Sequence, residues 1–173
     1  MSVVALIVGS LSKQSLNRHI AEQILKCAPE NVQIEEIDIS NLPLYSQDLD
    51  DINIPSYNRV REQIKGADAV LIASPEHNRT MPAALKNVID IATRPYGQNV
   101  WLNKKVAIVT ASPGVYGGIN AGLDLRKVLT FVGAEVLAQP EVYLSKASFD
   151  LDERTTNFLK QFAQRFFQWV ENK

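Results

Sequence analysis

Three short, almost wholly apolar runs constrain the fold of this chain more than any other feature. They occupy residues 3–8, residues 69–73 and the Val-Ala-Ile-Val centre of residues 104–110. Each run stops at small or turn-forming residues, as at Gly9-Ser10 and Ser74-Pro75. Continuous runs of this length, rich in β-branched residues, are typical of strands that are buried on both faces of a parallel sheet.

Segments with helical spacing alternate with these strands. After the first strand, Leu16, Ile20 and Ile24 recur every four residues, and Ser15 is a suitable N-cap. The helices predicted in this way cover residues 16–28, 57–65, 82–92, 123–132 and 151–170. The predicted strands are residues 3–8, 32–39, 69–73, 104–110 and 135–138, with residues 142–144 as a further candidate for the fifth position.

This alternation predicts an α/β fold, a flavodoxin-like three-layer sandwich with helices on both faces of the sheet. The expected five-stranded parallel sheet has the order 2-1-3-4-5. At 173 residues, with no linker or internal repeat, residues 1–173 are expected to form one domain. A chain of this size can bury roughly 70% of the surface that it exposes when unfolded, so it needs no disulfide.

The charge and cysteine content exclude several function classes. A formal net charge of -1 creates no field that would attract nucleic acid or a membrane surface. Cys27 is the only cysteine, so we expect a reducing, cytoplasmic location and no cysteine-based metal cluster. The apolar start is too short for a signal peptide or a membrane span.

The ligand site of an open parallel sheet lies outside the carboxyl ends of its strands, near the point where the strand order reverses. Three loops are expected there, at residues 9–17, 74–81 and 112–118. The first gathers Ser10, Ser12, Ser15 and Asn17 where a helix begins. Free N–H groups and the helix dipole favour an anion at such a place, so the loop predicts a phosphate site, although a serine-rich capped loop is the simpler alternative.

The size of the ligand follows from motifs that the sequence lacks. The first strand is not followed by G-x-G-x-x-G, and no G-x-x-x-x-G-K-[ST] occurs, which disfavours a tightly held dinucleotide and an NTPase. A monophosphate ester remains. Prolines bracket the second loop, and Gly114, Gly117 and Gly118 in the third allow positive φ and a close approach to a flat ligand.

These residues resemble the NAD(P)H-dependent FMN reductase family, the flavodoxin-like group that includes bacterial quinone, chromate and azo-dye reductases. The resemblance runs through nearly the whole chain. Its motifs are Gly9-Ser10-Leu11 with Ser15 and Asn17-Arg18, the segment at residues 42–49, Ser74-Pro75-Glu76-His77-Asn78, the helix at residues 85–90, Ser112, Gly114, Gly117-Gly118 and Leu125-Arg126.

The resemblance implies a bound FMN that takes hydride from NAD(P)H and passes electrons, in a ping-pong cycle, to quinones, chromate, azo compounds or other small acceptors. It requires no catalytic side chain and no metal. The residues that it assigns to FMN are Ser10, Ser12, Ser15, Leu16, Asn17 and Arg18 for the phosphate, Pro75, Glu76, His77 and Asn78 for the ring, and Ser112, Gly114, Gly117 and Gly118 for its other side. It also implies a homodimer or homotetramer, with the helix after Pro82 near the interface.

The sequence departs from the family pattern at four positions. Ser12 stands where an arginine is common, so Lys13 or Arg18 would have to supply the charge near the phosphate. His77 replaces a usual tyrosine, and Asn120 and Gly122 replace a frequent arginine and glutamine.

Three other residues receive an interpretation from their positions alone. We expect Cys27 to be an inert core thiol and His19 to be a solvated surface residue. Trp101, in a loop, is expected at an oligomer contact or in the wall of a substrate pocket.

Two competing functions remain open at this point. An electron carrier would hold FMN without turning over NAD(P)H, and such carriers usually present an acidic face. A regulator of the receiver type would have clustered acids after the first strand, where this chain has Gly9-Ser10.

Overall fold

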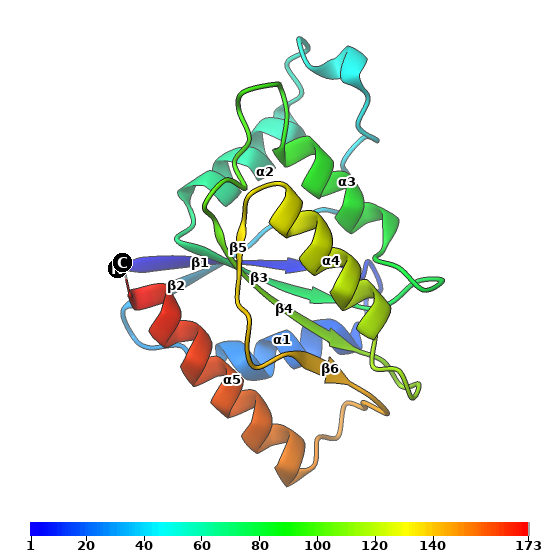
Figure 1. Cartoon of the computed structure of the whole chain (residues 1–173), viewed down its shortest axis with the longest axis vertical. Coiled ribbons are helices and arrows are strands. Elements are labelled where there is room, and N and C mark those ends of the chain that lie inside the picture. Colours follow the sequence, from blue (N-terminus) through cyan, green and yellow to red (C-terminus); the bar gives the residue numbers. More distant parts are fainter. Residues whose placement is uncertain (173) are drawn as a thin grey trace.

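A parallel sheet forms the centre of the computed structural model, which describes residues 1–172 (Figure 1). Its strands are β1 (Ser2–Val8), β2 (Val32–Glu36), β3 (Ala69–Ser74), β4 (Lys105–Ala111), β5 (Glu135–Val136) and β6 (Val142–Leu144). The order β2-β1-β3-β4-β5, with every pairing parallel, confirms the predicted topology.

The fifth position of the sheet is shared by two short strands. β5 pairs with Lys105 and Val106 at the start of β4, and β6 pairs with Val109 to Ala111 at its end. Pro140 lies between them, and a proline has no N–H to donate to a strand ladder. The two candidate segments therefore both belong to the sheet, which has six strands rather than five.

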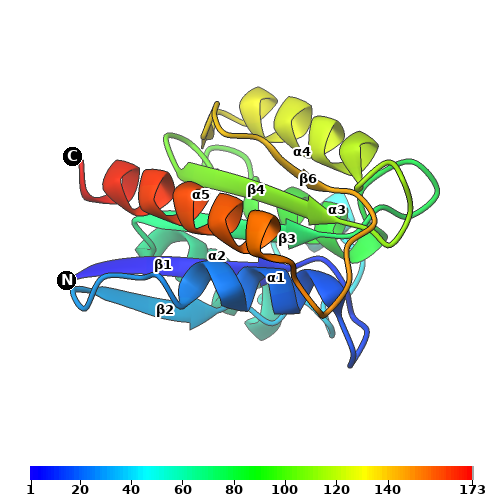
Figure 2. The same ribbon diagram turned by 90° about the horizontal axis from the view of Figure 1, so that it is seen from below.

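Helices cover both faces of the sheet, as predicted. The helices are α1 (Leu16–Leu25), α2 (Pro55–Gly66), α3 (Ala83–Ala92), α4 (Ile119–Phe131) and α5 (Glu153–Glu171), with a 3-10 turn at Gln47–Leu49. In Figures 1 and 2, α1 and α5 lie on one face of the sheet, and α2, α3 and α4 lie on the other. No helix in residues 1–172 combines the length and the apolar character needed to cross a membrane.

The alternation of side chains along β1 shows how one strand serves two cores. Val4, Leu6 and Val8 pack with α1 and α5, whereas Ala5 and Ile7 pack with α2, α3 and α4. Successive side chains of a strand point to opposite faces, so a strand between two helical layers must be apolar throughout. This requirement explains the uninterrupted apolar runs of the sequence.

Several element boundaries differ from the prediction for local reasons. Pro82 is the N-cap of α3 rather than its first helical residue, because its ψ of 146° is extended. Asp152 accepts a hydrogen bond from the N–H of Thr155, which starts α5 at Glu153 instead of at 151. β2 ends at Glu36, although Ile37 and Ile39 remain buried.

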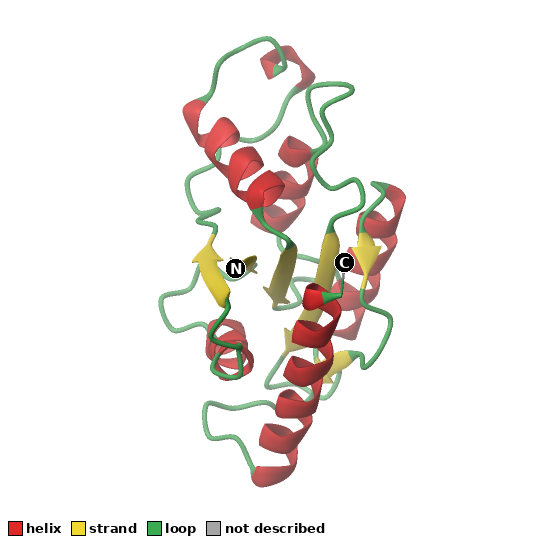
Figure 3. Ribbon diagram, turned by 90° about the vertical axis from the view of Figure 1, so that its left-hand side faces the viewer, coloured by secondary structure: helices red, strands yellow, loops and turns green. Residues whose placement is uncertain are grey.

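The long segment between β2 and α2 is anchored at several points. The N–H of Tyr45 donates to Asn87 Oδ1 (2.9 Å), and the hydroxyl of Tyr57 donates to the carbonyl of Pro43 (2.9 Å). Arg94 forms an ion pair with Asp50, which joins this segment to the loop after α3. Both loops project at the same end of the molecule in Figure 3.

The predictions for three isolated side chains meet different outcomes. Trp101 is fully buried and its Nε1 donates to the carbonyl of Ile89 (3.1 Å), so its placement at an oligomer contact or pocket wall was wrong. His19 is half-buried and its ring lies 5.4 Å from that of Phe149, so it is not simply solvated. Cys27 packs against the core beside α1, as predicted, although it is only partly buried.

Candidate functional site

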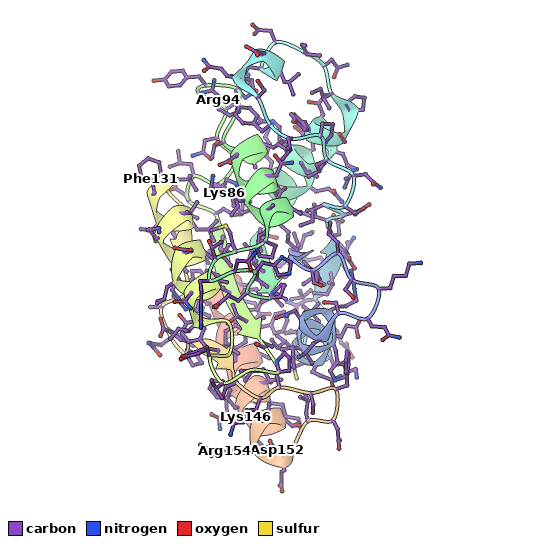
Figure 4. All side chains as sticks on the ribbon, turned by 90° about the vertical axis from the view of Figure 1, so that its right-hand side faces the viewer. Lys86, Arg94, Phe131, Lys146, Asp152 and Arg154 are labelled. Carbon is purple, nitrogen blue, oxygen red and sulfur yellow. The ribbon has the colours of Figure 1, made fainter. Side chains whose placement is uncertain are left out.

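The three predicted loops meet at one edge of the sheet. The carboxyl ends of β1, β3 and β4 point to the same side in Figure 1, and Figure 4 views the molecule from that side. All three loops line a cavity of about 220 Å³. The residues that line it are Ser10, Gln14, Ser15, Leu16, Asn17, Pro75, Glu76, His77, Ala111, Ser112 and Pro113.

The amino end of α1 supplies unpaired hydrogen-bond donors to this cavity. Ser15 is the N-cap, as predicted, and its Oγ accepts from the N–H of Arg18 (3.1 Å), which leaves its own hydroxyl hydrogen free to donate. Within residues 1–172, the backbone N–H groups of Leu16 and Asn17 have no acceptor. Free N–H groups at a helix N-terminus, together with serine hydroxyls, are the donors that a phosphate requires.

The side chain of Asn17 has a structural role that the sequence analysis did not predict. Its Oδ1 accepts from the N–H of Ala111 (2.9 Å) and its Nδ2 donates to the carbonyl of the same residue (3.1 Å). The buried amide thereby ties the start of α1 to the end of β4. A signal was present in the sequence, because Asn17 stands on the same helical stripe as Ile20, Ala21 and Ile24.

Arg18 and Ser12 line a neighbouring cavity of about 210 Å³ rather than the one beside Ser15. The Arg18 guanidinium makes two hydrogen bonds of 2.6 Å to the carboxylate of Glu36, which raise the pKa of Arg18. Its positive charge is therefore already paired. A contact between Arg18 or Ser12 and the phosphate stays a prediction, and for Arg18 it would require an exchange of partners.

The loop after β3 is a tight hairpin that the sequence did not indicate. The N–H of His77 donates to the carbonyl of Thr80 (2.9 Å), and the N–H of Thr80 donates back (3.1 Å). Asn78 and Arg79 between them have φ values of 49° and 70°. The left-handed region is unfavourable for arginine, but Arg79 is held by the Tyr116 ring, 4.5 Å from its guanidinium carbon, and by Glu76 at 3.6 Å.

Glu76 joins the second loop to the first turn of α4, which directly follows the third loop. Its Oε2 accepts from the N–H of Asn120 (2.9 Å) and the N–H of Ala121 (3.3 Å), and its Oε1 accepts from Asn120 Nδ2 (3.1 Å). The N-cap of α4 is Gly118, which has no side chain to cap the helix. A carboxylate from another loop therefore satisfies the first turn of α4, and the backbone of the Glu76 loop is fixed relative to that helix.

The third loop uses its glycines where the backbone requires them. Gly117 and Gly118 have φ values of 60° and 76°, as the sequence predicted. Gly114 does not adopt a positive φ, so conformational freedom is not its contribution. Its N–H donates instead to Ser112 Oγ (3.0 Å) in a short turn at the rim of the cavity. Asn78, Gly114, Gly117 and Gly118 belong to these loops but do not line the cavity.

The fold defines a flavodoxin-like protein, and its three loops meet at a cavity lined by serine hydroxyls and the free N–H groups of α1. Comparison with known proteins makes the class specific. The model of the family described as NADPH-dependent FMN reductase matches residues 1–149. The chain therefore belongs to the NADPH-dependent FMN reductase family. This match confirms FMN as the cofactor and NAD(P)H as the electron donor.

Individual relatives share most of their length with this chain. A quinone reductase of Pseudomonas putida is 41% identical over 97% of this chain and 94% of its own length. A 2-hydroxy-1,4-benzoquinone reductase of Burkholderia sp. is 37% identical over 98% and 97%. The solved structure of the flavoenzyme NAD(P)H:(acceptor) oxidoreductase FerB of Paracoccus denitrificans has a TM-score of 0.92 and 37% identity, covering 99% of this chain and 98% of its own.

Proposed function

We propose that this chain, as a single domain, is an NAD(P)H-dependent FMN-containing quinone reductase, with chromate and azo compounds as further acceptors. The observation that carries the proposal is the meeting of three loops at the amino end of α1, where free N–H groups and serine hydroxyls face one cavity. Relatives named as quinone reductases support the choice of quinones as acceptors. An FMN electron carrier without NAD(P)H turnover is not favoured by these relatives.

The first loop would hold the phosphate of FMN. Ser10 and Ser15 would donate through their hydroxyls, because each hydroxyl oxygen already accepts from a backbone N–H, of Ser12 (3.3 Å) and Arg18 (3.1 Å) respectively. Leu16 and Asn17 would donate through their free N–H groups. The donor set fits a dianionic phosphate without a lysine or arginine in the cavity.

The second and third loops would position the ring of FMN. Pro75, Glu76 and His77 present their segment to the cavity from one side, and Ser112 presents the third loop from the other. When bound, FMN supplies the redox chemistry by accepting a hydride from NAD(P)H and returning electrons to the acceptor, in a ping-pong cycle. The chain's own residues contribute binding and orientation, and no side-chain nucleophile or metal is part of the proposal.

Self-association into a homodimer or homotetramer, in the cytoplasm, completes the proposal. Phe131 at the carboxyl end of α4 is 89% exposed, and Figure 4 shows it on the outside of the molecule. Leu102 and Tyr96 in the loop after α3 are exposed as well. Contiguous exposed apolar patches mark interfaces, and we infer that these side chains contribute to one between copies of the chain. Light scattering should give two or four times the chain mass of 19.3 kDa, and a monomer at micromolar concentration would contradict it.

Anaerobic reduction of the FMN-loaded protein tests the proposed activity. The flavin bands near roughly 370 and 450 nm should bleach when NADPH or NADH is added and return when a benzoquinone is added. Bands that persist in the presence of both nicotinamide nucleotides would support the carrier instead. A protein that does not bind FMN would rule out both functions.

A further inference from the structure

The ring of Tyr143 in β6 lies directly on the backbone of Gly122 in α4. A Cβ atom placed on Gly122 would be 2.4 Å from Tyr143 Cε1 and 3.1 Å from its Cδ1. Such distances exclude any side chain at position 122 while the ring stays in place. Glycine is otherwise unfavourable within a helix, so its presence inside α4 is explained by the tyrosine that packs on it.

The hydroxyl end of the same ring is fixed to α4 as well. Arg126 Nε donates to the Tyr143 hydroxyl (3.2 Å), and Arg126 Nη1 donates to the carbonyl of Leu137 (2.9 Å). Glu141 completes the group through an ion pair of 3.3 Å with Arg126. Burial raises the pKa of the Tyr143 hydroxyl. The ring is therefore held at both ends, and it sets the distance between β6 and α4.

The backbone of β6 and of the residues that follow supports the third loop. A Cβ on Gly117 would lie 2.8 Å from the carbonyl of Tyr143 and from the N–H nitrogen of Ser145. Ser112 N–H donates to the Leu144 carbonyl (3.0 Å), Lys146 N–H to the Gly114 carbonyl (2.8 Å), and Ala147 N–H to the Ser112 carbonyl (2.9 Å). The loop that would face the flavin thus has its backbone bonded to β6, which Tyr143 positions, and to the segment that directly follows β6.

We propose that Tyr143, seated on Gly122, is a positioning residue for the loop of residues 112–118. A shift of the ring away from α4 would move β6, and the loop would follow through its three hydrogen bonds. Tyr143 is not among the residues that line the candidate cavity, so it acts through the loop. The inference rests on the proposed function, because it assigns the effect of Tyr143 to FMN binding.

A double-mutant cycle at Gly122 and Tyr143 tests the contact between them. Gly122→Ala should weaken FMN binding about tenfold, because the added methyl group displaces the ring. In Tyr143→Val the ring is absent, so adding Gly122→Ala to Tyr143→Val should cause no further loss of FMN affinity. Tyr143→Phe keeps the ring and should bind FMN within about twofold of the natural chain. Affinities come from quenching of FMN fluorescence.

A matched control and a second readout separate positioning from general damage. Gly66→Ala makes the same change at the carboxyl end of α2, where a Cβ would meet nothing within 4 Å, and should leave FMN affinity unchanged. At saturating FMN, the visible circular dichroism of the bound flavin should differ between Gly122→Ala and the natural chain, and Tyr143→Phe should retain the natural spectrum.

The outcomes distinguish this inference from the proposed function. A natural chain that fails to bind FMN overturns the proposed function and, with it, this inference. A natural chain that binds FMN, with Gly122→Ala folded and equal to it in affinity and spectrum, overturns the inference alone. An equal loss from Gly122→Ala in the presence and in the absence of the Tyr143 ring would also overturn it.

Discussion

The side-chain amide of Asn17 and the backbone of Ala111, 94 positions apart, form a closed pair of hydrogen bonds, one donated and one accepted. The pair fixes the amino end of α1 against the carboxyl end of β4. Glu76 in turn fixes the second loop to α4, and the third loop has backbone hydrogen bonds to Leu144, Lys146 and Ala147, so all three loops are held by contacts that do not depend on a ligand. The site is organised in advance, which lowers the entropy that the loops lose when a cofactor binds.

Asn17→Asp should destabilise the protein even before a cofactor binds. The carboxylate can still accept from the Ala111 N–H, but its second oxygen would face the Ala111 carbonyl in a buried position. We expect a loss of about 1–3 kcal/mol in the free energy of unfolding, measured by urea denaturation without FMN. Asn157→Asp, an exposed site on α5, is the control. Equal stability of the two variants would show that the amide pair contributes little.

Ser15 combines two roles that a pair of substitutions can separate. Glycine is almost as good an N-cap as serine, whereas alanine is not. Ser15→Gly should therefore change stability by only a few tenths of a kcal/mol, and Ser15→Ala should lose about 1 kcal/mol. Both variants lose the hydroxyl that would donate to the phosphate, and both should bind FMN about tenfold more weakly. Fluorescence titration and thermal unfolding measure the two effects. Unchanged FMN affinity in Ser15→Gly would remove Ser15 from the phosphate site.

Glu76→Ala should loosen the contact between the second loop and α4. The variant leaves the N–H groups of Asn120 and Ala121 without the carboxylate that caps them. The expected loss of stability is about 1 kcal/mol, together with weaker FMN binding. Glu62→Ala on the exposed surface of α2 is the matched control and should change neither quantity. If Glu76→Ala bound FMN as tightly as the control Glu62→Ala does, the second loop would hold its shape without Glu76.

The ion pair between Asp50 and Arg94 predicts a dependence of stability on pH. The hydrogen bond from Arg94 lowers the pKa of Asp50 below the ordinary aspartate value of 3.8. A carboxyl with a lowered pKa in the folded state stabilises the protein above its unfolded pKa, and this contribution disappears as the pH falls through the folded value. The difference in melting temperature between the natural chain and Asp50→Asn should therefore be largest near neutral pH and shrink below about pH 4.

The neighbouring residue provides the control for that pH series. Asp51→Asn removes a carboxylate that is exposed, so its melting temperature should follow the natural chain at every pH. A difference for Asp50→Asn that stays constant from pH 7 to pH 3 would indicate a packing effect instead of the ion pair.

The fold could be predicted because its cause is local in the sequence. The apolar runs of β1, β3 and β4 indicate strands that are buried on both faces of the sheet. The spacing of Leu16, Ile20 and Ile24 indicates a helix that packs on one of these faces. The prediction for Trp101 was wrong because the cause of its burial is not local in the sequence. Its burial depends on the carbonyl of Ile89, which no pattern around residue 101 reveals.

The location of the site followed from topology, whereas the tasks of its side chains did not. Residues that end β1, β3 and β4 must meet at one edge, so Ser15, His77 and Ser112 could be grouped from the sequence. The bonds of Asn17 to Ala111 and of Glu76 to Asn120 join segments far apart in the chain. The hairpin at Asn78 and Arg79 was unexpected because its second left-handed residue is an arginine, held there by Tyr116.

Titration of the natural chain with FMN and with riboflavin tests the central claim most directly, because the two ligands differ only in the phosphate. If the phosphate binds at the amino end of α1, among Ser10, Ser15 and the free N–H groups, FMN should bind about 100-fold or more tightly than riboflavin. Equal affinities would contradict the account, because the donors at α1 would then have no part in holding the cofactor.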